Sequence, residues 1–227
     1  MIAGLQKLTL LDYPGRTACT VFLRGCDFNC PYCHNHGLIS EDPGEGGIEE
    51  EELLRFLEKR KNMLDGVCIS GGEPLMHGSV IALMRDIRAL GYDIKVDTNG
   101  SFPERLREAA EAGLCDYIAM DIKNSPEKYA ETAGTEGAAE RVGESVEYIM
   151  RCGLPYEFRT TAVKELHEPE DFERIGERIE GAERYFIQNF RDPGTGRARG
   201  LSPCGRGELE RFLAAARKYV PAAELRG

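Results

Sequence analysis

Strand-like and helix-like segments alternate along most of the 227-residue chain, and this alternation constrains the fold more than any other feature. The predicted strands cover residues 17–23, 66–70, 94–97, 117–121, 156–163 and 185–187. After each strand, apolar residues recur at helical spacing. Such alternation is typical of parallel sheets with right-handed crossovers. Six strand–helix units are too few for a closed barrel of eight. We therefore expect an α/β fold, an open partial (βα)6 barrel with parallel strands, as one domain over residues 1–227.

Polar or glycine-rich residues stand at the ends of the predicted strands, where sheets and barrels of this class gather their functional sites, except that Arg159 lies within the fifth strand. From the second strand to the sixth they are Gly71, Gly72 and Glu73; Asp97, Thr98 and Asn99; Asp121 and Lys123; Arg159; and Gln188. Each group also has a plain structural explanation, such as a tight turn or an exposed ion pair. Their placement at successive strand ends is what favours a functional site.

A cysteine loop follows the first predicted strand. Cys26, Cys30 and Cys33 have the spacing C-x3-C-x2-C, and no fourth cysteine lies nearby. Thiolates are soft ligands that suit iron–sulfur clusters, and a cubane cluster has four irons. Three ligands therefore leave one iron open for chemistry. A structural zinc site is the alternative, with His34 or His36 as the fourth ligand.

Charge and cysteine usage limit the other possibilities. The net charge of -10 gives no sign of the basic face that a nucleic-acid binder needs. No apolar run is long enough to span a membrane, and the N-terminus lacks a signal-peptide pattern. We expect a cytoplasmic protein with reduced thiols and no membrane partner. Cys19, Cys68 and Cys115 are predicted to be buried, whereas Cys204 lies in a Gly/Arg loop where either a buried or an exposed position is compatible with the sequence.

Several motifs together resemble a known family. They are the cysteine loop with an aromatic residue before its last cysteine, Gly71-Gly72-Glu73-Pro74, Asp12-Tyr13-Pro14-Gly15-Arg16, Cys33-His34-Asn35, Asp97-Thr98-Asn99-Gly100 and Asp121-Ile122-Lys123. The chain resembles the radical S-adenosylmethionine superfamily, and within it the branch that activates glycyl radical enzymes. In that branch it is most similar to the activating proteins of anaerobic ribonucleoside-triphosphate reductases.

The resemblance implies a set of cofactors and site residues. Cys26, Cys30 and Cys33 would hold a 4Fe–4S cluster, and Asp121 and Lys123 would complete the catalytic group. The residues implied to bind S-adenosylmethionine are Tyr32, Cys33, His34, Gly71, Gly72, Glu73, Asp97, Thr98, Asn99, Asp121, Lys123, Arg159 and Gln188. In this branch, a monovalent cation is also implied beside the acidic members of that set.

The resemblance further implies the reaction. One electron from the reduced cluster would cleave S-adenosylmethionine to a 5′-deoxyadenosyl radical, which removes a hydrogen atom from a glycine of a partner enzyme. The implied partners are a glycyl radical enzyme like anaerobic ribonucleotide reductase, and a flavodoxin or ferredoxin as electron donor. Because no cysteine lies between Cys33 and Cys68, we expect a single cluster.

One departure from the family pattern and two alternative functions remain to be considered. Gln188-Asn189-Phe190 stands where pyruvate formate-lyase activating enzymes carry a histidine, so that partner is disfavoured. A radical enzyme acting on a small molecule, such as a deazapurine-type synthase, is the main alternative. A non-enzymatic zinc or electron-carrier protein is the other, but it leaves Gly71–Pro74 unexplained.

One segment, Arg191–Gly207, is longer than an ordinary connection and carries four arginines in an otherwise acidic chain. Loops of this length are typically functional or disordered. We expect this one either to be a solvated loop or to dock a partner.

Overall fold

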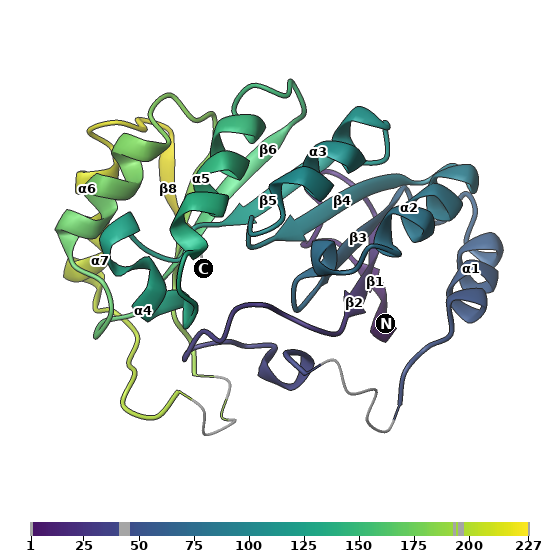
Figure 1. Ribbon diagram of the computed structural model, residues 1–227, viewed down its shortest axis with the longest axis horizontal. Helices are drawn as coiled ribbons and strands as arrows, with labels where there is room; N and C mark the ends of the chain where they lie inside the picture. The colour runs from purple at the N-terminus through teal and green to yellow at the C-terminus, as the bar shows by residue number, and fades with distance from the viewer. Residues whose placement is uncertain (1, 41–45, 193, 195–197, 227) are drawn as a thin grey trace. The chain divides into compact units, whose positions relative to one another are not determined.

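The computed structural model describes residues 2–40, 46–192, 194 and 198–226. Its strands form one open sheet in the order β1 to β8, with β1 and β8 at the edges (Figure 1). The strands are β1 (Ile2–Thr9), β2 (Ala18–Leu23), β3 (Gly66–Gly71), β4 (Asp93–Thr98), β5 (Tyr117–Asp121), β6 (Tyr156–Ala162), β7 (Tyr185–Asn189) and β8 (Ala223–Arg226). The expected α/β class and the six central strands, β2 to β7, are confirmed.

Helices follow the central strands as expected. They are α1 (Glu50–Lys59), α2 (Val80–Ala89), α3 (Pro103–Glu111), α4 (Tyr129–Ala133), α5 (Ala138–Ile149), α6 (Pro169–Arg178) and α7 (Arg206–Ala216), with short 3-10 turns η1 (His36–Leu38), η2 (Pro74–Met76) and η3 (Pro126–Lys128). The sequence pattern missed α4 and both edge strands. β1 runs antiparallel to β2 and exposes its middle residues, and β8 has only four residues, so neither carries a clear apolar period.

The chain forms two compact units. The first comprises Met1–Asp27, Gly37–Thr98 and Glu104–Ile118, and the second comprises Phe28–His36, Asn99–Pro103 and Ala119–Gly227. Strand β5 contributes residues to both units.

In the first unit, β2, β3 and β4 run parallel in continuous register. One face of these strands is apolar and fully buried, as the register pair Ile69 and Val96 shows. Side chains alternate between faces along a strand. The opposite face therefore carries a row of register partners, Thr20, Cys68 and Lys95, all of them buried. A lysine inside this row is unusual, because a buried charge must be paired.

In the second unit, β6, β7 and β8 pair in parallel. Aromatic side chains fill its core: Phe158 of β6 is fully buried, and Phe172 of α6 stacks on Phe212 of α7 with ring centroids 4.5 Å apart. The hydroxyl of the buried Tyr185 donates to Thr160 Oγ1 at 2.8 Å, so the ring is anchored at its polar end as well. These contacts fix the strands that carry the site residues of this unit.

Two glycines at the end of β3 allow a close contact between two backbone segments. Gly72 N donates to Leu23 O at 2.9 Å, and Glu73 N donates to Gly25 O at 2.8 Å. A Cβ atom added to Gly71 would lie 2.2 Å from Leu23 O, and one added to Gly72 would lie 2.0 Å from Gly25 O. Both positions must therefore lack a side chain. The glycine pair thus packs against the segment that leads into the cysteine loop.

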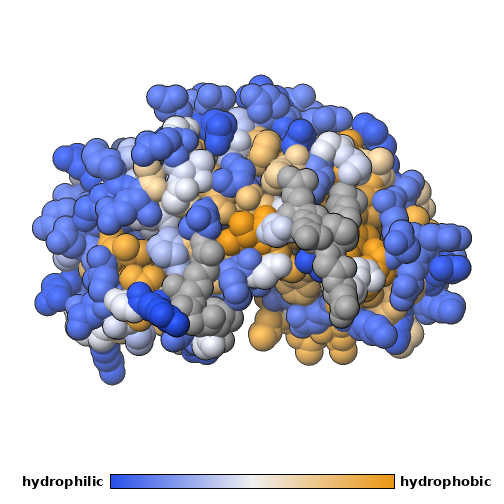
Figure 2. Space-filling model, turned by 60° about the horizontal axis from the view of Figure 1, so that its bottom comes forward, coloured by the Kyte–Doolittle hydropathy of each residue, from blue (hydrophilic) through white to orange (hydrophobic). Residues whose placement is uncertain are grey.

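One face of the molecule, shown in Figure 2, is largely hydrophilic. The face in Figure 2 is mostly blue, with smaller orange patches of apolar residues between the polar ones. Among the described residues, no helix is both long enough and apolar enough to cross a membrane.

The contact at Gly72 gives the first prediction. Gly72→Ala should lower the free energy of unfolding by about 1–3 kcal/mol, because the new methyl group would overlap the carbonyl of Gly25. Gly78→Ala is the matched control, since a Cβ atom there meets nothing within 4 Å and its backbone is not in the left-handed region. Urea titrations of the three proteins measure both changes. Equal stability of the two variants would contradict this explanation of the glycine.

Candidate functional site

The expected site residues are divided between the two units, and each group is described within its own unit. In the first unit, Cys26 lies directly beside the glycine pair. Its amide donates to Ile39 O at 3.2 Å, and a Cβ atom on Gly72 would lie 3.2 Å from the Cβ of Cys26. The structure therefore brings the first cysteine of the loop and the Gly-Gly-Glu-Pro motif together, although 45 residues separate Cys26 from Gly71 in the sequence.

Glu73 is fully buried and organises the turn after β3. Its Oε1 accepts hydrogen bonds from Leu75 N at 3.0 Å and from Thr98 Oγ1 at 2.8 Å. Thr98 ends β4, so the carboxylate ties the ends of two neighbouring strands together. These contacts assign Glu73 and Thr98 a structural task that the sequence pattern did not indicate.

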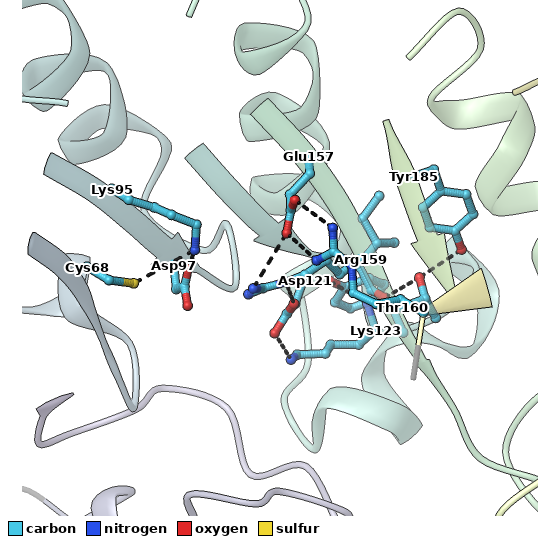
Figure 3. A network of polar contacts seen from close by, with 12 residues as sticks. Cys68, Lys95, Asp97, Asp121, Lys123, Glu157, Arg159, Thr160 and Tyr185 are labelled. Carbon is cyan, nitrogen blue, oxygen red and sulfur yellow. Dashed lines mark hydrogen bonds and ion pairs between the residues drawn. The ribbon is translucent and has the colours of Figure 1, made fainter. Parts of the chain in front are cut away.

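Asp97 forms an ion pair with a residue that the sequence analysis did not single out. Lys95 and Asp97 share one face of β4, and the ammonium of Lys95 contacts Asp97 Oδ1 (Figure 3). Lys95 also lies 3.8 Å from the sulfur of Cys68, its register partner on β3. The available signal was a charged residue inside the apolar run Ile94-Lys95-Val96.

In the second unit, the cysteine loop is held against α4. Asn29 N donates to Ala133 O at 2.8 Å, and the thiol of Cys30 points to the same carbonyl oxygen at 3.7 Å. Cys33 N donates to Cys30 O at 3.2 Å, which closes a tight turn between the two cysteines. Cys30 is buried, and Cys33 is partly exposed.

Tyr32 lies inside this turn, and its side chain is buried. Its ring meets Phe190 edge-on with centroids 6.5 Å apart, and His34 meets the same ring edge-on at 6.2 Å. Among the described residues, the Tyr32 hydroxyl has no hydrogen-bond partner. A buried hydroxyl without a partner is costly, so it marks a place where a ligand can supply one.

Asp121 is the centre of an ionic cluster at the end of β5. Arg159 Nε donates to Asp121 Oδ1 at 2.8 Å, and Lys123 Nζ donates to Oδ2 at 3.0 Å (Figure 3). Burial alone would raise the pKa of Asp121, but the two cations outweigh it and hold that pKa well below its ordinary value. Burial alone would likewise lower the pKa of Lys123, but Asp121 outweighs it and the pKa is raised. Both groups are therefore charged at neutral pH.

The cluster also acts on the cysteine loop. Burial raises the pKa of the Cys30 thiol, whereas the nearby charge of Lys123 lowers it and that of Asp121 raises it. These effects show that Cys30, Lys123 and Asp121 lie within electrostatic reach of one another. Burial outweighs the cation, so the pKa of the Cys30 thiol is raised overall, and Lys123 only reduces that rise.

A second ionic contact continues from Arg159. Glu157, two residues earlier on β6, is 2% exposed, and its carboxylate receives Arg226 of β8 in a two-pronged contact at 2.8 and 3.0 Å. The Arg226 guanidinium also lies over the Phe186 ring, 3.4 Å from its centroid. The sequence analysis missed Glu157 and Arg226, because isolated charges in strands are usually interpreted as solvent-facing.

The two remaining expected residues have modest local roles. Asn99 Oδ1 accepts from Ser101 N at 2.9 Å, so this side chain closes the turn before α3. Gln188 stands on β7 opposite Thr161 and is partly exposed.

The donor set fits an iron–sulfur cluster better than zinc. Cys26 belongs to the first unit, and Cys30 and Cys33 belong to the second. Within either unit, the described residues contain no group of three His, Cys, Asp or Glu side chains that could hold a metal ion. Soft thiols dominate the loop, and His34, one proposed zinc ligand, packs its ring against Phe190.

The long segment 191–207 is only partly described, since residues 193 and 195–197 lie outside the described residues. Its second half is anchored to β7. Asn189 Nδ2 donates to Cys204 O at 3.0 Å, and Cys204 N donates to Asn189 Oδ1 at 2.9 Å. Cys204 is 5% exposed and therefore buried, although it lies in a loop rich in glycine and arginine.

The other cysteines agree with the sequence analysis. Cys19, Cys68 and Cys115 are buried, and all eight cysteines are free thiols.

A family model of the Radical SAM superfamily matches residues 20–179, which is most of the chain. The chain belongs to the radical SAM superfamily. It is 32% identical over 195 residues to a protein of Methanocaldococcus jannaschii that is named as a candidate glycyl-radical enzyme activating enzyme, with 84% of this chain and 80% of that protein covered. It is also 28% identical over 158 residues to the 7-carboxy-7-deazaguanine synthase of Thermococcus kodakarensis, with 61% of each covered.

Solved radical SAM structures share the fold. SuiB of Streptococcus suis, crystallised with S-adenosylmethionine, superposes with a TM-score of 0.70 at 15% identity. The match covers 92% of this chain and 52% of SuiB, so this chain spans about half the length of that protein.

Membership of this superfamily implies a 4Fe–4S cluster and S-adenosylmethionine as cofactors. The resemblance seen in the motifs is therefore confirmed at the level of the superfamily, and the protein is a radical SAM enzyme.

The ionic cluster gives a pH-dependent prediction. Asp121→Asn should lower the free energy of unfolding by about 1–2 kcal/mol near pH 7, a modest value because the carboxylate is 34% exposed and partly screened. The folded-state pKa of Asp121 is depressed, so its contribution is present above the unfolded pKa of about 3.9 and is lost as pH falls through the folded value. The difference between the two proteins should therefore be constant from about pH 5 to 7 and shrink below about pH 4.

Urea titrations at several pH values measure this difference. Asp86→Asn, at an exposed position of α2, is the control and should change stability little at any pH. If the difference in free energy of unfolding between wild type and Asp121→Asn grows as pH falls, Lys123 and Arg159 do not stabilise the Asp121 carboxylate as described.

The unpartnered hydroxyl gives another prediction. Tyr32→Phe should raise the stability of the cofactor-free protein by about 1 kcal/mol, because it removes a buried group that lacks a hydrogen bond. Tyr129→Phe is the matched control and should lower stability, since the Tyr129 hydroxyl accepts a hydrogen bond from Lys123 N at 3.2 Å. Thermal denaturation under anaerobic conditions separates the two variants. A loss of stability in Tyr32→Phe would mean that the hydroxyl has a partner.

Proposed function

We propose that this radical SAM enzyme activates a glycyl radical enzyme by removing a hydrogen atom from a glycine of its partner. The observation that carries the proposal is the ionic cluster of Asp121, Lys123 and Arg159 within electrostatic reach of Cys30. When bound, a 4Fe–4S cluster and S-adenosylmethionine would supply a 5′-deoxyadenosyl radical. The protein supplies binding, orientation and exclusion of water and oxygen.

The charges of the second unit match one end of the cofactor. S-Adenosylmethionine carries a carboxylate, an ammonium and a sulfonium group. Lys123 and Arg159 suit the carboxylate, because charge-assisted hydrogen bonds from cations to carboxylates are short and strong. Asp121 lies between these two cations and fixes where they can reach. Asp121 and Lys123 thus act by holding the cofactor in a reactive position.

Aromatic side chains suit the other end of the cofactor. Tyr32, His34 and Phe190 form an edge-on aromatic group around the cysteine turn. An adenine ring packs favourably against such side chains. The unpartnered Tyr32 hydroxyl offers a donor to the same ligand.

A protein substrate is favoured by the relative from Methanocaldococcus jannaschii, whose name describes an activating enzyme and which this chain matches over 84% of its length. A fold of this kind also accommodates peptides, since SuiB has been crystallised with the precursor peptide SuiA. The proposed partner is an enzyme like anaerobic ribonucleotide reductase, with a flavodoxin or ferredoxin as electron donor.

A second candidate function is radical chemistry on a small molecule. The similarity to a 7-carboxy-7-deazaguanine synthase favours it. It predicts turnover of a purine-like substrate and no glycyl radical on any partner protein.

Anaerobic reconstitution with iron and sulfide tests the proposal. The protein should bind about four irons per chain, and after reduction it should convert S-adenosylmethionine to 5′-deoxyadenosine. Cys30→Ala should abolish both, because two thiolates do not hold the cluster. Cys152→Ala, at a partly exposed cysteine outside the loop, is the matched control and should retain both. Iron content, absorbance and chromatography of the products measure the outcome.

Electron paramagnetic resonance then separates the two functions. A glycyl radical doublet on an added anaerobic ribonucleotide reductase supports activation. Cofactor cleavage with no doublet on any glycyl radical enzyme, but with consumption of a purine-like compound, supports the alternative. A purified protein that retains zinc and never cleaves S-adenosylmethionine would refute both.

A further inference from the structure

The ion pair between Lys95 and Asp97 lies in the first unit and is largely shielded from solvent. The Lys95 side chain is 2% exposed and that of Asp97 is 17% exposed. The two residues share one face of β4, and the Lys95 ammonium contacts Asp97 Oδ1 (Figure 3). Such a pair costs solvation energy on both sides, so it needs a specific reason to be present.

The surroundings of Lys95 hold its ammonium at this place. Its register partner on β3 is Cys68, whose sulfur lies 3.8 Å from Lys95 Nζ, and Thr20 of β2 is the next residue in the same row. Both neighbours are small and completely or almost completely buried. They leave room for the long lysine side chain to run along the strands toward Asp97, at the carboxyl end of β4.

We infer that the ammonium of Lys95 is a built-in counter-cation for Asp97 and takes the place of the monovalent metal ion that the motif resemblance implied beside the acidic residues. The inference rests on the proposed function, in which Asp97 belongs to the cofactor-binding set. A sodium or potassium ion bound to Asp97 Oδ1 would meet an ammonium group already in contact with that oxygen. Two cations in contact with the same oxygen atom repel each other strongly where solvent is largely excluded.

This arrangement makes Lys95 a positioning residue. Its contact with Oδ1 fixes the direction of the Asp97 carboxylate at the strand end. A covalently attached cation cannot dissociate, so the site stays charge-balanced whatever the salt composition. We therefore expect binding and cleavage of S-adenosylmethionine to be independent of sodium and potassium.

A double-mutant cycle on the reconstituted, full-length protein tests the inference. Melting temperatures are measured anaerobically at constant ionic strength while N-methylglucamine chloride is replaced by potassium or sodium chloride. Wild type should show no saturable response to either metal ion. Lys95→Met removes the ammonium that contacts Asp97 Oδ1, so its melting temperature should fall by several degrees and recover at least half of that loss as the metal ion saturates the site. The double variant Lys95→Met/Asp97→Asn should lose the response, because no carboxylate remains to bind the ion.

Lys218→Met is the matched control. Lys218 is also paired with a carboxylate, Glu173 at 2.8 Å, but it is 56% exposed. Removing it should cause a small change in melting temperature and no metal-ion response, since solvent screens an exposed carboxylate.

Wild-type protein gives a second test that does not depend on folding of the variants. Thallium(I) is a potassium mimic, and its nuclear magnetic resonance signal should shift no more with wild type than with Asp97→Asn. A saturable thallium or potassium effect on wild type that disappears in Asp97→Asn would overturn the inference. So would a Lys95→Met variant that folds and shows no metal-ion response.

The same preparations separate failure of this inference from failure of the proposed function. If wild type cleaves S-adenosylmethionine only when potassium or sodium is present, the inference fails and the proposed function stands. If no preparation cleaves the cofactor but the stability cycle behaves as described, the proposed function fails and Lys95 is still the counter-cation of Asp97.

Discussion

The contact between two backbone segments at the end of β3 is the constraint on which the cysteine loop depends. Gly71 and Gly72 admit the backbone of residues 23–25 at distances that any side chain would prevent. Two backbone hydrogen bonds then fix the chain just before Cys26. A metal ligand must be held close to its final position before the metal arrives, because each freely moving ligand adds an entropic cost to binding. The glycine pair meets that requirement with backbone atoms alone.

In each unit, the aspartate among the expected site residues is paired with one or two cationic side chains. Asp121 lies between Lys123 and Arg159, and Asp97 is joined to Lys95. In each set, removal of the cation would leave the carboxylate with less compensation for its burial and would destabilise the fold. Fixed charges of this kind need no rearrangement when a zwitterionic ligand binds, and preorganised groups contribute more to binding and catalysis than mobile ones. The arrangement therefore favours a charged cofactor over an apolar ligand.

Most of the fold was predictable from sequence, because six apolar strands alternate with amphipathic helices at clear spacing. The exceptions have a common physical cause. β1 and β8 are edge strands with exposed residues, so they carry little periodic signal. Lys95 and Glu157 were missed because a single charge in a strand suggests an exposed face, whereas here each charge is neutralised by a partner that only the folded chain reveals. The strand-end motifs and the cysteine loop were found because their chemistry is local. Their close packing, such as Cys26 beside Gly72, depends on contacts between distant segments and could not be derived from spacing.

The contact between Glu157 and Arg226 has a consequence for the order in which the molecule is completed. Glu157 belongs to β6, but its two-pronged partner is supplied by β8, 69 residues later in the chain. During synthesis on the ribosome, β6 emerges well before Arg226 does. Until β8 is made, the buried Glu157 lacks the two hydrogen bonds that Arg226 donates to it. A chain cut between α7 and β8 would therefore keep the acid in β6 but lose the cation of β8, so loss of only a few residues from that strand should weaken the packing of β6 as well.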